Sequence, residues 1–178
     1  MDKQKLQSYL QRVLRILAIW TLRKYKPGVI AVTGSVGKTS TKEAIYAVLK
    51  HFRRARCSGG NFNNELGLPL TILGDWREIS GKYFWLRVIL TAIWRLVWRS
   101  EYPEILILEY AVDRPGDIKY LLDIAHPQIG AVTAIGDIPV HVEFFSGPEA
   151  VAREKSKVVE ALPASGFAIL NYDDQAVL

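Results

Sequence analysis

Several features that mark large classes of proteins are missing from this sequence of 178 residues. It has a single cysteine, Cys57, which excludes an intramolecular disulfide and favours a reducing, cytoplasmic setting. We find no secretory signal peptide, internal repeat or low-complexity tract. The composition, 49% apolar and 23% charged, instead predicts one globular domain with a sizeable core.

Positive charge is gathered in the first 26 residues, where a basic amphipathic helix is predicted within residues 1–27. Apolar residues recur there at three- and four-residue spacing, and Pro27 with Gly28 ends the pattern. A second basic cluster consists of Arg53, Arg54 and Arg56. Such clusters suit anionic partners, either nucleotide phosphates or an anionic membrane surface. Because the chain has no base-stacking motif, we do not expect nucleic acid as a partner.

Strands and helices alternate after residue 28, which predicts an α/β fold with a mainly parallel sheet and flanking helices. Ligands of such sheets bind at the carboxyl ends of the strands. Strands are predicted at 29–33, 105–108, 129–135 and 167–170. Helices are predicted after the first strand, with Ala44, Ile45, Val48 and Leu49 on its apolar face, and at 118–124 and 148–162.

A strongly apolar helix is predicted near 82–99, with Arg87, Thr91, Arg95 and Arg99 in one polar stripe. It is too short and too charged for a membrane span. This helix and the N-terminal one could pack on each other, or they could together form an interfacial membrane anchor. The sequence leaves both alternatives open.

The strongest chemical signal is Gly34-x-x-Gly37-Lys38-Thr39, between a predicted strand and a predicted helix. Glycines let backbone amides approach a phosphate, and a helix N-terminus adds positive potential. Lys38 supplies a full charge, and the Thr39 hydroxyl can bind Mg²⁺. The alternative is an ordinary tight turn, since Val32 stands where the common phosphate loop has its first glycine. The nucleotide-binding candidates are Gly34, Ser35, Val36, Gly37, Lys38, Thr39 and Ser40.

Two charged side chains fall on apolar elements. Glu109 closes a buried strand at the ligand-binding end, where it could hold Mg²⁺ or reach solvent. Lys155 shares the apolar stripe of its helix with Val151 and Val158, which is costly unless the amine is paired, neutralised or modified. The alternative is that its stem extends and the ammonium reaches water.

The segment from Thr33 to Glu43 resembles the ATP-binding signature of the Mur ligase family. The likeness continues in 61–70, in Glu109 with 115–118, and in 131–136, 141–143, 152–155 and 170–174. It implies a P-loop-type Mur ligase central domain over 28–178, with an apolar helical insertion near 82–99. Because the chain ends at Leu178, we expect this domain to be incomplete and the isolated chain to be inactive.

The resemblance also implies roles for individual residues. Lys38, Glu109, His141 and Lys155 would be catalytic, with Lys155 carbamylated. Thr39, Glu109, His141 and Lys155 would bind Mg²⁺ beside ATP. Asn63 and Asn64 could be simple turn formers, but the family likeness places their loop near the substrate.

The resemblance implies an ATP-dependent ligase of peptidoglycan precursor synthesis, which would join a dipeptide to a UDP-sugar peptide through an acyl phosphate. Two other functions stay open at this point. The chain could be a non-catalytic ATP-binding module at the inner surface of the membrane, or part of a ligase of the folate or polyglutamate type.

Overall fold

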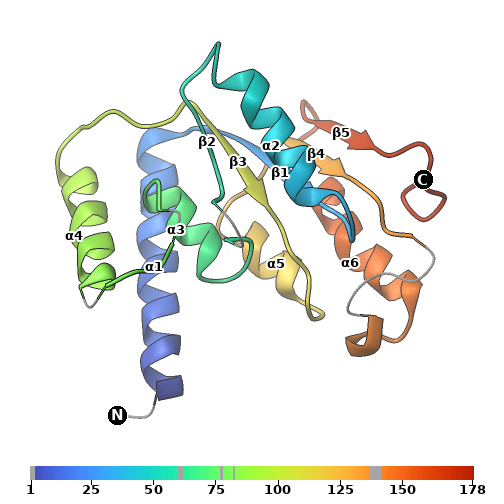
Figure 1. Cartoon of the computed structure of the whole chain (residues 1–178), viewed down its shortest axis with the longest axis horizontal. Helices are drawn as coiled ribbons and strands as arrows, with labels where there is room; N and C mark the ends of the chain where they lie inside the picture. The colour runs from blue at the N-terminus through green and yellow to red at the C-terminus, as the bar shows by residue number, and fades with distance from the viewer. Residues whose placement is uncertain (1–2, 60–61, 77, 82, 137–141) are drawn as a thin grey trace.

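The computed structural model describes residues 3–59, 62–76, 78–81, 83–136 and 142–178 (Figure 1). Within them one sheet of five strands has the order β2-β3-β1-β4-β5, and every neighbouring pair is parallel. The strands are β1 (Gly28–Thr33), β2 (Ala55–Cys57), β3 (Ile105–Glu109), β4 (Ile129–Val132) and β5 (Phe167–Leu170). The prediction of an α/β fold with a parallel sheet is therefore confirmed.

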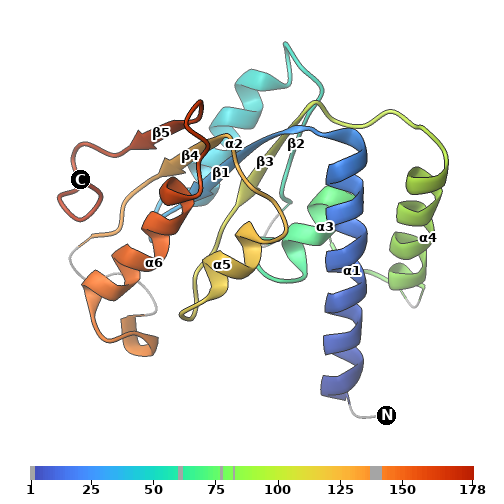
Figure 2. The same ribbon diagram turned by 180° about the vertical axis from the view of Figure 1, so that it is seen from behind.

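Helices cover both faces of this sheet (Figures 1 and 2). They are α1 (Lys3–Tyr25), α2 (Lys38–Leu49), α3 (Gly67–Leu73), α4 (Phe84–Val97), α5 (Asp117–Leu122) and α6 (Pro148–Glu160), with a short 3-10 helix at Val142–Phe144. Helix α2 lies alone on one face, and the other helices lie on the opposite side. The helices predicted at 2–25, near 82–99, at 118–124 and at 148–162 are confirmed to within a few residues.

The period-two alternation of the strands divides the core in two. In β1, Val29 and Ala31 pack into the larger core with α1, α3, α4 and α5. Ile30 and Val32 point to the other face, where they pack with residues of α2. Helix α1 contributes fully buried residues to the larger core, so it is an integral part of this unit.

Two details of the predicted elements are wrong. The strand starting at Ile129 ends at Val132 and not at Ile135, because the chain turns there and the Ala134 carbonyl accepts hydrogen bonds from the phosphate loop. The buried face of α2 also differs from the predicted one. Ile45 and Leu49 pack on the sheet as expected, together with Tyr46, but Ala44 and Val48 are exposed.

Strand β2 and helix α3 were not predicted. One reason is that Arg56 of β2 contacts α3, a contact that the sequence does not reveal. Its guanidinium donates hydrogen bonds to the carbonyls of Thr71 (3.0 Å) and Ile72 (3.1 Å), and it lies 5.1 Å from the Tyr102 ring centroid. These carbonyls belong to the last turn of α3, which has no intrahelical donors for them. Arg56 is therefore a structural cation that binds the protein itself, and the prediction that it belongs to a basic cluster suited to an anionic partner does not hold for this residue.

We predict that Arg56→Met lowers the free energy of unfolding by about 1–3 kcal/mol, since it leaves the buried Thr71 carbonyl without its side-chain donor and the Ile72 carbonyl with only the Tyr102 hydroxyl. Urea unfolding of both proteins measures the difference. The control is Arg53→Met, which removes an exposed arginine three residues away and should change stability by less than about 0.5 kcal/mol. Equal effects of the two substitutions would contradict the structural role of Arg56.

Candidate phosphate-binding and metal-binding site

The loop between β1 and α2 depends on two glycines with left-handed backbone angles. Gly34 has φ 141° and Gly37 has φ 88°, values that side chains rarely allow. A Cβ atom at Gly34 would lie 2.0 Å from Oγ1 of Thr133, so only glycine fits there. The amides of Ser35 and Val36 donate to the Ala134 carbonyl at 2.6 and 3.1 Å. The loop is therefore fixed against the chain that follows β4.

The first turn of α2 presents unpaired amides. The Thr41 amide bonds to the Gly37 carbonyl at 2.9 Å, so the helical pattern starts there and the amides of residues 38–40 have no intrahelical acceptor. Nζ of Lys38 lies 3.0 Å from the carbonyls of both Gly34 and Ser35, which places its charge over the loop. Free amides, a helix N-terminus and an ammonium together fit a phosphate group.

Glu109, at the end of β3, lies beside this helix start. Its side chain is only 2% exposed. Oε2 accepts a hydrogen bond from Oγ1 of Thr39 at 3.1 Å, and Oε1 accepts one from Nδ2 of Asn63, also at 3.1 Å. The structure thus brings together Lys38 and Thr39, at the start of α2 after β1, and Glu109, at the end of the neighbouring strand β3.

Lys42 is a member of this cluster that the sequence analysis missed. Its side chain is fully buried, and Nζ lies 3.4 Å from Oε2 of Glu109. Nζ makes no hydrogen bond within the described residues. The sequence did contain a signal for Lys42, because it lies four residues after Lys38 in the predicted helix and residues four apart share a helix face. The buried lysine compensates the buried carboxylate.

Lys155 of α6 is 1% exposed, so its ammonium does not reach water along the helix surface. The pKa of Lys155 is lowered to about 8, mainly by burial and also by the nearby charge of Lys38, while the carboxylates of Asp113 and Glu154 act in the opposite direction. Burial also lowers the pKa of Lys38, whereas the nearby carboxylates of Glu109 and Asp113 raise it. Two lysines and the Asp113 carboxylate therefore share one electrostatic environment.

Glu154 holds α6 in place next to Lys155. Its Oε1 accepts hydrogen bonds from the amides of Gly116 (3.0 Å) and Ile118 (3.3 Å) at the start of α5, and its Oε2 accepts one from Lys157 (2.6 Å). Neither Glu154 nor Asp113 was predicted. Asp113 lies in the irregular segment before α5 and Glu154 in the middle of α6, and the contacts of both depend on the tertiary fold.

The remaining predicted residues lie around this centre. Oδ1 of Asn64 accepts hydrogen bonds from the amides of Leu66 (3.3 Å) and Gly67 (3.1 Å), so this side chain caps the start of α3. A substrate role for Asn63 and Asn64 stays a prediction. His141 lies outside the described residues.

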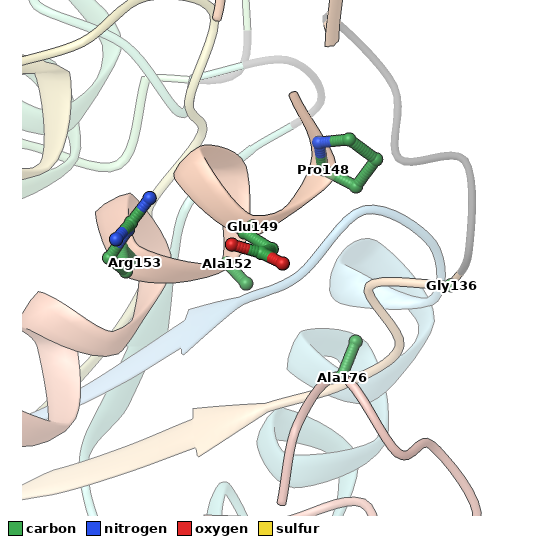
Figure 3. Close-up of a pocket in the computed structure, with 6 residues that line it drawn as sticks. All are labelled: Gly136, Pro148, Glu149, Ala152, Arg153 and Ala176. Carbon is green, nitrogen blue, oxygen red and sulfur yellow. The ribbon is translucent and has the colours of Figure 1, made fainter. Parts of the chain in front are cut away.

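A cavity of about 470 Å³ opens next to the same edge of the sheet (Figure 3). It lies between the first turns of α6 and the turn that carries Ala176, and Gly136 forms part of its wall. Asp174 holds this turn in place, because its carboxylate accepts hydrogen bonds from the amides of Ile135 (2.6 Å) and Gly136 (2.9 Å). These bonds lower the pKa of Asp174. Gly136 in the cavity wall follows closely after Ala134, whose carbonyl binds the phosphate loop, so the cavity and the loop are joined by one short segment.

The donor set at Glu109 fits Mg²⁺ better than a transition metal. Within the described residues, no group of three or more His, Cys, Asp or Glu side chains gathers as a metal site. A carboxylate and a hydroxyl leave most positions of an octahedral ion to water and phosphate oxygens, which is how Mg²⁺ is usually bound.

Comparison with known families identifies the domain type. The profile of the Mur ligase middle domain matches residues 32–80 and 96–178. The chain is 38% identical over 149 residues to the UDP-N-acetylmuramoyl-tripeptide--D-alanyl-D-alanine ligase of Mycobacterium tuberculosis, covering 84% of this chain and 24% of that protein. The Bacillus subtilis enzyme of the same name is 33% identical over 161 residues, which cover 90% of this chain and 30% of that protein.

Solved structures agree with these relatives. The MurF ligase of Thermotoga maritima in complex with ADP has a TM-score of 0.72 and 34% identity, over 92% of this chain and 32% of that one. MurF of Acinetobacter baumannii has a TM-score of 0.72 and 26% identity, and the match covers 94% of this chain and 31% of that one. The chain thus spans between a quarter and a third of the length of these proteins.

We predict that Lys42→Met lowers the free energy of unfolding by about 3–5 kcal/mol, because Glu109 would keep a buried charge without its ammonium partner. Urea unfolding measures the loss. In the double variant Lys42→Met/Glu109→Gln no charge is left uncompensated, so more than half of the lost stability should return. A double variant as unstable as the sum of the two single variants would refute the pairing.

Proposed function

Since this chain belongs to the Mur ligase family through its middle domain, we propose that it is the ATP-binding part of a ligase that adds D-alanyl-D-alanine to UDP-N-acetylmuramoyl-tripeptide. The observation that carries the proposal is the convergence of Lys38, Thr39 and Glu109 at one edge of the sheet. The names of its relatives supply the substrates. Their greater length means that other parts of such an enzyme would have to hold those substrates.

The proposed reaction has two displacements. A carboxylate oxygen of the UDP-sugar peptide attacks the γ-phosphorus of ATP, and the bond to the bridging oxygen breaks to release ADP. The amine of the dipeptide then attacks the carbon of the acyl phosphate, phosphate leaves, and the new amide loses a proton to solvent. Both steps need positioning and neutralisation of charge more than they need a protein nucleophile.

The chain's own residues supply that neutralisation. The amides of residues 38–40 and the Lys38 ammonium would bind the β- and γ-phosphates. Thr39 and Glu109 would hold one Mg²⁺, and His141 with modified Lys155 would help to hold a second. The metal would supply positive charge beside the phosphate oxygens. Ser35 has a buried hydroxyl without a hydrogen-bond partner in the described residues, which suits a polar ligand at this loop.

Carbamylation of Lys155 is the second part of the proposal. The neutral amine attacks the carbon of CO₂, a nitrogen–carbon bond forms, and one proton is released, which leaves a carboxylate on the side chain. Burial supports this, because a pKa of about 8 leaves a substantial fraction of free amine near neutral pH. The nearby Lys38 ammonium would then stabilise the anion that forms.

A ligase of the folate or polyglutamate type has weaker support. The folylpolyglutamate synthetase variant of L. casei is only 14% identical to the chain, with a TM-score of 0.51, so the likeness concerns the fold alone. The relatives at 33–38% identity are all named for the D-alanyl-D-alanine reaction. A substrate panel on the full-length protein separates the two alternatives.

We expect the purified chain to bind Mg-ATP in calorimetry and the Lys38→Ala variant to bind it at least 10-fold more weakly. Loss of a charge-assisted contact costs about 1.5–3 kcal/mol, which is roughly 10- to 150-fold in Kd. The matched control is Lys50→Ala, at the other end of α2, which should bind like the wild type. Binding that is unchanged in Lys38→Ala would place the nucleotide elsewhere.

The carbamate of Lys155 should be detectable by ¹³C NMR of the chain under ¹³CO₂ at constant pressure, and it should be missing in Lys155→Met. Its amount should rise as the pH rises through about 8, because the amine is protonated below that pKa and free above it. Lys38→Met removes a charge that lowers this pKa, so it should move the rise to higher pH. Asp113→Asn removes an opposing carboxylate and should move it to lower pH. A carbamate that appears only near pH 10.5, as for an ordinary lysine, would contradict the proposal.

A further inference from the structure

The side of helix α4 that faces away from the protein is apolar over its whole length. We call it the α4 outer face; it consists of Leu86, Leu90, Ile93, Trp94 and Val97, each between 44% and 63% exposed. The opposite side of the helix is buried in the core through Phe84, Val88 and Ala92. A surface helix usually turns polar residues outward, and a helix that is apolar all round is normally covered on all sides.

Two arginines of the polar stripe that the sequence shows on this helix contact the rest of the protein. The guanidinium of Arg95 donates a hydrogen bond to the Leu73 carbonyl, and that of Arg87 lies 5.3 Å from the ring centroid of Trp76. The arginines therefore stabilise the attachment of α4 and leave its apolar residues to face outward. Something other than this domain has to cover the α4 outer face.

The two helices that form this surface carry charge of one sign. Helices α1 and α4 contain no Asp or Glu, whereas α1 carries six Lys or Arg residues and α4 carries two. Nζ of Lys24 in α1 lies within 3.0 Å of three carbonyls at the end of α4, so the two helices are held together with positive charge at the junction. A second copy of the chain would bring like charges together, whereas an anionic surface would be attracted.

Aromatic residues are concentrated at the same place. The chain has five tryptophans: Trp20 lies in α1, Trp85 and Trp94 lie in α4, and Trp98 follows α4 directly. The fifth, Trp76, packs on Phe84 at the start of α4. Trp94 and Trp98 stack with ring centroids 4.1 Å apart, and each is more than half exposed. A groove of about 480 Å³ runs between α1 and α4, lined mainly by Leu6, Tyr9, Leu10, Val13, Trp85 and Ile89. Tryptophan and tyrosine favour the boundary between lipid headgroups and acyl chains.

Both helices lie outside the residues that match the family profile. The profile leaves out residues 1–31 and 81–95, which contain all of α1 and most of α4. Figures 1 and 2 show α4 at the outer edge of the molecule, with α1 between it and the sheet. The apolar surface is therefore made by elements that the matched middle domain does not include, away from the phosphate loop.

We propose that α1 and α4 bind the surface of an anionic lipid bilayer, with the α4 outer face among the upper acyl chains and the basic residues of α1 beside the lipid phosphates. None of the helices in the described part of the chain is long and apolar enough to cross a bilayer, so they would lie in its plane. This inference does not depend on the proposed ligase reaction, because it uses none of the residues at the phosphate loop.

The test is co-sedimentation of the whole chain with vesicles of phosphatidylcholine containing 40% phosphatidylglycerol, alongside vesicles of phosphatidylcholine alone. We expect binding to the anionic vesicles that is at least 10-fold tighter than to the neutral ones and that weakens in 0.5 M salt. Quenching of tryptophan fluorescence by lipids brominated on the acyl chains should accompany binding. Absence of binding to the anionic vesicles would overturn the proposal.

Two matched variants locate the surface. Leu90→Glu/Trp94→Glu changes two exposed residues of α4 and should reduce vesicle binding at least 10-fold with an unchanged circular dichroism spectrum. Val48→Glu/Phe52→Glu makes the same kind of change at exposed apolar positions on the α2 side and should bind like the wild type. Equal losses of vesicle binding in both variants would contradict a lipid-binding role. So would a wild type that binds no vesicles but self-associates, if only the α4 variant abolishes that self-association.

Discussion

The carboxylate of Glu109 determines how the centre of this molecule can be built. It lies at the end of a buried strand, where an ionised group is costly unless it has partners. Lys42 supplies the charge, and Thr39 and Asn63 supply hydrogen bonds. Because two of these partners lie on α2, the same contacts fix the start of that helix relative to β3. The geometry of the phosphate loop thus depends on the burial of one acid.

The charges around this carboxylate are balanced to accept a further anion. Burial lowers the pKa of both Lys38 and Lys155, and the Lys38 charge further contributes to lowering that of Lys155. The Asp113 carboxylate offsets only part of these shifts. A bound phosphate would relieve the repulsion between the two lysines. Conversion of Lys155 to a carbamate would replace a like charge with an opposite one. Both proposals for this site therefore rest on the same pair of partly buried lysines, Lys38 and Lys155.

Much of this arrangement was accessible from sequence, because it depends on local order along the chain. The run from Val29 to Thr39 predicts a strand, a glycine loop and a helix start, and the buried strand ending at Glu109 predicts where that acid lies. Lys155 was recognisable because it interrupts an apolar stripe. These inferences need only side-chain periodicity and the rule that parallel strands end at one edge.

Other features could not be read from the sequence, because their partners are far away along the chain. Arg56 looks like a surface cation until α3 is folded against β2, and Glu154 looks like a solvated residue until α5 begins beside it. Arg95 of α4 belongs to a polar stripe in the sequence, which does not reveal that its guanidinium donates a hydrogen bond to the Leu73 carbonyl of α3. In each case a long side chain satisfies backbone groups of another element, and only the tertiary fold specifies which ones.

The central claim is that the carboxyl ends of β1 and β3 hold the phosphates of a nucleotide. It is tested most directly by amide NMR of the ¹⁵N-labelled chain during titration with Mg-ADP. The account predicts that the largest shift changes occur at residues 34–40, with smaller ones at Glu109 and Asp113, and none on the outer side of α4. Saturable binding that leaves the amides of residues 34–40 unchanged would contradict it.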